Sequence, residues 1–116
     1  MGLILHITTR QQWQNAEATG AYRTDSLESE GFIHCSTSEQ VLGPANAMYR
    51  GRQDLVLLCI DPARVQPPIV FEDCYESGQA FPHVYGPLNV DAVVNVVDFP
   101  LGKDGFFSLP AEIGKQ

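Results

Sequence analysis

Three histidines, His6, His34 and His83, carry the most versatile chemistry in this sequence, and each lies in or beside an apolar stretch typical of a β-strand. Two of them are followed at the second position by a hydroxyl, His6 by Thr8 and His34 by Ser36. Residues i and i+2 of a strand point to the same face, so each imidazole and its hydroxyl would point the same way. Two adjacent strands would then line one cleft with paired donors and acceptors. The alternative is that an individual histidine is a core residue bonded to the backbone.

Three kinds of site fit such a cleft. A zinc site would use the imidazoles and Cys35, but the sequence lacks the CxxC, HxH or HExxH spacing that specifies zinc, so we expect no metal. A nucleophilic Cys–His pair would use Cys35 or Cys74. Because His34 and Cys35 alternate to opposite faces of a strand, Cys35 is better explained as a small core residue. Recognition of a ribose and phosphate ligand agrees best with the residues present, since imidazoles bond sugar hydroxyls and act as general acid and base.

Glu72 is a further candidate catalytic residue. It ends an apolar stretch, where a carboxylate can act as a general base or stabilise a developing oxocarbenium ion. Taken alone, its position beside Asp73 is more typical of a solvated charge at a strand end.

The elements that would position these residues follow from hydrophobic patterning. Ser36 and Glu39 match a capping box at a helix start, and Gly43-Pro44 falls in the middle of the helix that would follow, where it would kink or split it. The segment 20–30 is predicted as a loop with at most one helical turn, and the tail from residue 101 would cover the core. The predicted strands span 3–7, 31–35, 54–60, 69–72, 81–88 and 91–99, and the predicted helices span 10–18 and 37–50. This order predicts an α+β fold with a mostly antiparallel, curved sheet.

The composition describes one domain. The chain has 116 residues, of which 44% are hydrophobic and 18% charged, and this is enough to bury a core. Its net charge of −7 differs from the basic surface of a nucleic-acid-binding protein, although a few local donors can still hold a small anion. Three cysteines without a CxxC pair, and the lack of a signal-peptide or membrane-spanning pattern, predict a reduced cytoplasmic protein.

Several segments resemble a bacterial and plant family catalogued as domain of unknown function 952. The resemblance covers nearly the whole chain and rests above all on two blocks, Gly-Phe-Ile-His-Cys-Ser at 31–36 and Phe-Pro-His-Val-Tyr-Gly-Pro-Leu at 81–88. Residues 5–8, Trp13 and Gly20 also match. The family implies no particular reaction.

The N-terminal half also looks distantly similar to the ADP-ribosyltransferase superfamily, and most of all to its RNA 2′-phosphotransferase branch. That resemblance implies a split, curved antiparallel sheet that holds NAD in a cleft. It would make His6 the first-strand histidine that bonds a ribose and His34 its second-strand counterpart, with Thr8 and Ser36 as the neighbouring hydroxyls. The backbone around Ile7 would hold the nicotinamide amide.

Two features of the superfamily have no clear match in this chain. The glutamate that it often carries on a later strand has only candidates here, namely Glu72, His83 and Tyr85. The arginines with which the phosphotransferase branch holds RNA phosphate are also missing, apart from Arg23 in a loop.

The resulting expectation is an ADP-ribosyltransferase-like cleft that binds NAD or a related ADP-ribose or nucleotide ligand. The residues expected to line it are His6, Thr8, His34, Ser36, His83 and Tyr85. Its chemistry would be ADP-ribosyl or 2′-phosphate transfer, or hydrolysis, with an RNA end or a protein as acceptor. One alternative is a non-catalytic ligand-binding or interaction module. The other is a two-histidine phosphodiesterase, which uses two His-x-Thr/Ser motifs as acid and base, although those motifs usually lie farther apart than His6 and His34.

Overall fold

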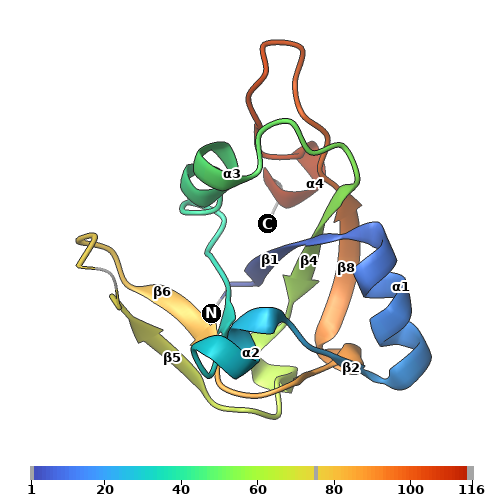
Figure 1. Cartoon of the computed structure of the whole chain (residues 1–116), viewed down its shortest axis with the longest axis vertical. Helices are drawn as coiled ribbons and strands as arrows, with labels where there is room; N and C mark the ends of the chain where they lie inside the picture. The colour runs from blue at the N-terminus through green and yellow to red at the C-terminus, as the bar shows by residue number, and fades with distance from the viewer. Residues whose placement is uncertain (1, 75, 115–116) are drawn as a thin grey trace.

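A three-stranded antiparallel sheet forms the centre of the computed structural model, which describes residues 2–74 and 76–114. Its strand order is β1 (Ile4–Thr9), β4 (Leu55–Ile60) and β8 (Val93–Asp98). All six residues of β4 are buried, as the continuous apolar sequence of this central strand predicts. Figure 1 shows these three strands side by side, with α1 (Arg10–Thr19) beside them.

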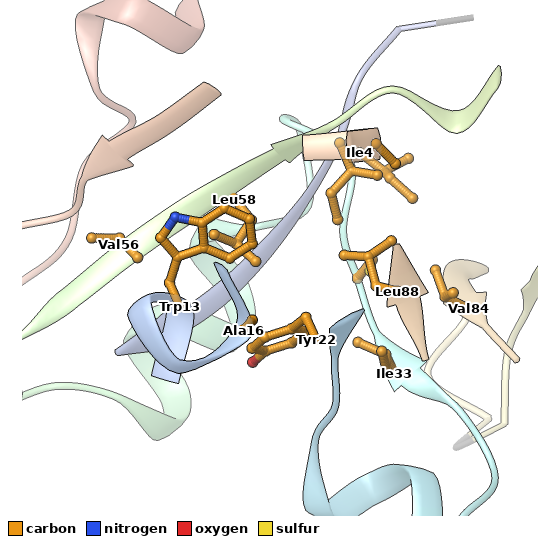
Figure 2. Close-up of a cluster of buried hydrophobic side chains, with 12 residues drawn as sticks. Ile4, Trp13, Ala16, Tyr22, Ile33, Val56, Leu58, Val84 and Leu88 are labelled. Atoms are coloured by element: carbon orange, nitrogen blue, oxygen red, sulfur yellow. The ribbon is translucent and has the colours of Figure 1, made fainter. Parts of the chain in front are cut away.

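The side chains of β4 alternate between two hydrophobic clusters, one on each face of the sheet. Val56 and Leu58 point into the first cluster, where Trp13 from α1 lies against them (Figure 2). The opposite face of β4 belongs to the second cluster, which contains Leu57 and Phe107. One strand therefore supports both halves of the core.

Helix α1 begins and ends where the sequence predicts. The Thr9 hydroxyl accepts a hydrogen bond from the Gln12 backbone N–H at 3.1 Å, which satisfies one of the free donors of the first turn. Gly20 adopts a left-handed conformation with φ of 88° and donates its N–H to the Ala16 carbonyl, which ends the helix.

A second three-stranded sheet carries most of the candidate residues. Its order is β3 (Ile33–His34), β6 (Phe81–Val84) and β5 (Ile69–Glu72), again antiparallel. In Figure 1, β5 and β6 form a hairpin on the side of the molecule away from α1. A bridge between Leu5 and Ser36 joins the end of this sheet to β1.

The remaining elements are short. Strands β2 (Ala21–Tyr22) and β7 (Leu88–Asn89) pair with each other, and two 3₁₀ turns, η1 (Pro62–Arg64) and η2 (Val90–Ala92), flank the central sheet strands. The segment predicted as a loop contains both β2 and the one-turn helix α2 (Asp25–Ser29). The tail adds α4 (Ala111–Gly114) and covers the core with Phe107, whereas Phe106 is exposed.

The helix predicted over 37–50 is shorter in the structure. Helix α3 spans Leu42–Met48 and has no side-chain cap, and the chain before it forms turns. The capping box at Ser36 does not form, because the Ser36 backbone pairs with Leu5 and the Gln40 side chain accepts the Thr37 N–H at 3.1 Å. Pro44 therefore lies in the first turn of α3, where proline is tolerated, and does not kink the helix.

The predicted α+β class agrees with this mixture of antiparallel sheets and few helices. Across residues 2–74 and 76–114, no helix has the length and apolar character needed to cross a lipid bilayer.

Candidate functional site

One face of the β3-β6-β5 sheet gathers titratable and aromatic side chains. The register places His34 directly opposite His83. Since residues two apart on a strand share a face, Phe32 joins His34, Tyr85 joins His83, and Glu72 on β5 lies on the same side. We call these five residues, Phe32, His34, Glu72, His83 and Tyr85, the histidine face.

Glu72 is the centre of a hydrogen-bonded group on this face. Its Oε2 atom lies 2.9 Å from Nδ1 of His83 and accepts a hydrogen bond from the Tyr85 hydroxyl. The bonds from Tyr85 and His83 lower the pKa of the Glu72 carboxyl, so this group is a carboxylate at neutral pH. The same carboxylate raises the pKa of Tyr85 to about 12, which keeps the phenol protonated. The His83 side chain is 2% exposed and that of Glu72 is 28% exposed.

Aromatic contacts hold the two imidazoles in place. The Phe32 ring stacks on His83 with centroids 4.0 Å apart and meets His34 edge-on at 4.8 Å. The centroids of His34 and His83 are 5.4 Å apart. His34 Nε2 lies 2.8 Å from the Glu30 carboxylate, and this pair is partly open to solvent. The face thus presents two neighbouring imidazoles, each beside its own carboxylate.

Cys74 borders the same group. Its Sγ atom lies 3.9 Å from Nδ1 of His83. Desolvation and the negative charge of Glu72 raise the pKa of the Cys74 thiol, which disfavours the thiolate that a cysteine nucleophile needs. Cys35 is a buried core residue, as expected, and burial raises its pKa to about 12.

His6 lies in a separate, buried network. Its Nδ1 donates to the backbone carbonyl of His34 at 2.5 Å, and its Nε2 lies 2.8 Å from the Tyr22 hydroxyl. That hydroxyl is 2.8 Å from Oγ1 of Thr8. Burial lowers the pKa of His6 to about 4, so the ring is neutral at neutral pH. This network joins β1 to β2 and β3, which favours a structural role for His6 and Thr8.

The sequence-predicted residues therefore fall into two groups. His34, Glu72, His83 and Tyr85 come together on the histidine face. His6 bonds the backbone carbonyl of His34 and the Tyr22 hydroxyl, Ser36 is buried at the bridge to β1, and Ile7 packs against the second hydrophobic cluster. The single cleft expected between the imidazoles of His6 and His34 is replaced by these two distinct environments.

Comparison with protein families gives a match over residues 7–96 to DUF952, described as a protein of unknown function. The chain belongs to the DUF952 family. The matched segment contains the whole histidine face and begins directly after His6.

Solved structures of one bacterial protein are similar to this DUF952 chain throughout. The crystal structure of protein CC0527 from Caulobacter crescentus is 32% identical, covers 97% of this chain and 98% of that chain, and has a TM-score of 0.85. The solution NMR structure of CC0527 is 31% identical, covers both chains fully and has a TM-score of 0.78. A comparison with the curated proteins gives no match. These comparisons lend no support to the ADP-ribosyltransferase resemblance.

Three residues that contact the histidines were not identified from the sequence, namely Glu30 and Phe32 beside His34 and Tyr22 beside His6. Phe32 stands two residues before His34, so strand alternation alone places it on the same face. Glu30 reaches His34 from the end of α2, and Tyr22 reaches His6 from β2, and neither contact leaves a local pattern in the sequence.

Proposed function

We propose that the histidine face binds NAD or a related ADP-ribose-containing nucleotide, and that Glu72 supports chemistry at the nicotinamide-ribose carbon. The observation that carries this proposal is the ionised Glu72 carboxylate, held by His83 and Tyr85 next to a second, more accessible imidazole at His34.

Four residues of the histidine face have roles in the proposed complex. The His34 imidazole and its partner Glu30 are exposed enough to bond ribose hydroxyls. Departure of nicotinamide leaves positive charge on the ribose carbon, and a preorganised carboxylate at Glu72 stabilises that charge in the transition state. His83 is buried and acts by positioning Glu72, together with Tyr85.

This proposal changes the roles that the ADP-ribosyltransferase resemblance implies. Both ring nitrogens of His6 already have partners inside the protein, so the ribose contact moves to His34. The later-strand glutamate corresponds to Glu72 on β5. The assignment of His6, Ile7, Thr8 and Ser36 to the ligand remains a prediction that the geometry does not favour.

A two-histidine phosphodiesterase is the second candidate, with His83 in place of the His6 expected from the sequence, because the His34 and His83 ring centroids lie 5.4 Å apart. Two imidazoles at this spacing can act as acid and base on one phosphodiester. The carboxylates of Glu30 and Glu72 beside them repel any anionic group, whether a phosphodiester or the pyrophosphate of NAD, but they stabilise positive charge that develops on a ribosyl carbon. On this transition-state argument we rank ribosyl chemistry first.

Binding is tested by calorimetric titration and thermal unfolding with NAD, ADP-ribose and a 2′-phosphorylated RNA end. A ligand at a hundredfold excess over its Kd stabilises the native state by about 2.7 kcal/mol, which raises the melting temperature. We expect NAD or ADP-ribose to produce this shift, His34→Ala to abolish it, and Glu28→Gln, a nearby exposed charge change, to leave it intact. No shift with NAD or ADP-ribose would overturn the proposal.

Catalysis is tested by release of nicotinamide from NAD. Glu72→Gln keeps the size of the side chain but removes its charge, so we expect the rate to fall about a hundredfold or more. Affinity for NAD should change much less than the rate. Binding without any nicotinamide release by the unmodified chain would instead favour the non-catalytic binding module.

A further inference from the structure

Three different metal-ligating groups converge at one end of the histidine face. Glu72 contributes a carboxylate from the end of β5, Cys74 a thiol from the chain just after it, and His83 an imidazole from β6. One potential ligand atom from each lies within 4.8 Å of the other two. Residues distant in sequence are thus brought together by the β5–β6 pairing, without any local zinc motif.

The spacing of these atoms is close to that of a metal site. Ligand bonds of 2.0 to 2.3 Å around a tetrahedral zinc ion place neighbouring ligand atoms about 3.5 Å apart. The Glu72 Oε2 to His83 Nδ1 distance is 2.9 Å, and the Cys74 Sγ to His83 Nδ1 distance is 3.9 Å. Small side-chain adjustments would suffice to admit an ion between them.

The donor types and their surroundings favour zinc over calcium or magnesium. Thiolate and imidazole are preferred zinc ligands, whereas calcium and magnesium need sites built of oxygen atoms. Zinc sites also orient their ligands through a second layer of contacts. Here the Tyr85 hydroxyl bonds the Glu72 carboxylate, and the Phe32 ring stacks on His83.

The local charge also suits a cation. Glu72, Glu30 and Asp73 place negative charge around the Cys74 thiol. A divalent ion bound there would be attracted by these carboxylates, and a coordinating thiol loses its proton to the metal. Of the three cysteines, Cys74 is the exposed one, whereas Cys35 and Cys59 are buried.

We propose that Glu72, Cys74 and His83 bind one Zn²⁺ ion and leave a fourth coordination position open on the histidine face. Three protein ligands with one open position are the arrangement of catalytic rather than structural zinc sites. The open position would accept a water molecule or an anionic oxygen. A bound Zn²⁺ would neutralise the Glu72 carboxylate that the proposed function uses, so the ion and the ribosyl chemistry are alternatives at this residue. The ion site itself does not depend on that function.

The test is titration of the metal-free full chain with Zn²⁺ by calorimetry and with Co²⁺ by absorption spectroscopy. We expect one ion per chain and, for Co²⁺, the charge-transfer band of a thiolate ligand. Cys74→Ser should abolish the band and weaken Zn²⁺ binding at least about tenfold, and Tyr85→Phe should weaken it by about tenfold through the loss of a second-layer contact. Glu17→Gln on α1 removes a comparable negative charge far from the site and should change neither result.

Three outcomes would overturn the proposal: no stoichiometric Zn²⁺ binding, binding that Cys74→Ser leaves unchanged, or a Co²⁺ complex without the thiolate band. His34→Ala separates this proposal from the nucleotide proposal, because His34 is outside the ligand set. Loss of NAD binding with Zn²⁺ binding intact supports the ion site and places His34 at the nucleotide. If the unmodified chain binds Zn²⁺ but not NAD, the ion site is supported and the nucleotide proposal is not.

Discussion

At the scale of single residues, His6 shows how burial determines protonation. Its ring lies between the His34 carbonyl and the Tyr22 hydroxyl, and its pKa falls to about 4 from the 6.5 of an exposed imidazole. Between these two pH values the unfolded chain binds a proton that the native state excludes. The stability that this neutral ring contributes is therefore complete above about pH 6.5 and is lost as the pH falls toward 4.

Acidification should therefore destabilise the protein through His6. A depression from 6.5 to about 4 corresponds to about 3 kcal/mol of unfolding free energy across this window. Urea unfolding of the unmodified chain and of His6→Gln, at about pH 4 and at about pH 6.5, measures this change in unfolding free energy. We expect the variant to be less stable at neutral pH but to depend less steeply on pH. An NMR titration of His6 with a midpoint near 6.5 would contradict this account.

The sequence indicated which residues can take part in catalysis or binding, but not which of them lie together in the fold. His34, Glu72, His83 and Tyr85 were predicted as site residues, and the structure brings them together. The sequence could not show that His6 and His34 lie in different environments, because each histidine is followed at the second position by a residue with a hydroxyl group. What distinguishes the two imidazoles is the Tyr22 hydroxyl beside one and the Glu30 carboxylate beside the other.

At the scale of elements, strong local sequence patterns predicted helix α1 and the longer strands correctly. Some of the shortest strands were not predicted. The apolar run of β4, and the caps of α1 at Thr9 and Gly20, follow from local chemistry and were predicted. Strands β2 and β7 have two residues each, too few to show any alternation. The late start of α3 depends on the bridge from Ser36 to Leu5, a contact between distant parts of the chain.

The N-terminal cap of α1 provides a test at this scale. Removing the Thr9 hydroxyl leaves the Gln12 N–H without its partner, so Thr9→Ala should lower the unfolding free energy by about 1 kcal/mol. Thr9→Ser keeps the hydroxyl and should retain most of the stability. Chemical denaturation of the three proteins measures the difference. Equal losses in both variants would show that the methyl group, not the hydroxyl, is responsible.

At the scale of the whole molecule, β4 couples the two hydrophobic clusters. Leu57 and Leu58 are both fully buried but point to opposite faces, so each supports a different cluster. A strand shared in this way should make the two clusters unfold together.

Truncating either leucine tests this coupling. Leu57→Ala and Leu58→Ala should each cost about 2 to 5 kcal/mol of unfolding free energy. Trp13, the single tryptophan, reports on the first cluster, yet Leu57→Ala in the second cluster should shift its fluorescence transition as well. Far-ultraviolet circular dichroism should give the same midpoint. A Trp13 transition unmoved by Leu57→Ala would mean that the clusters unfold separately.

The pairing of His34 with His83 also limits how the length of this chain can change during evolution. Successive residues of a strand face opposite sides, so inserting or deleting one residue within β6 would place Val84 or Pro82 opposite His34 and turn the His83 ring toward the other face. Length changes near Gly78, between the two hairpin strands, would leave that pairing in place. Natural variation in length should therefore concentrate at the tip of the hairpin, while β6 itself keeps a constant number of residues.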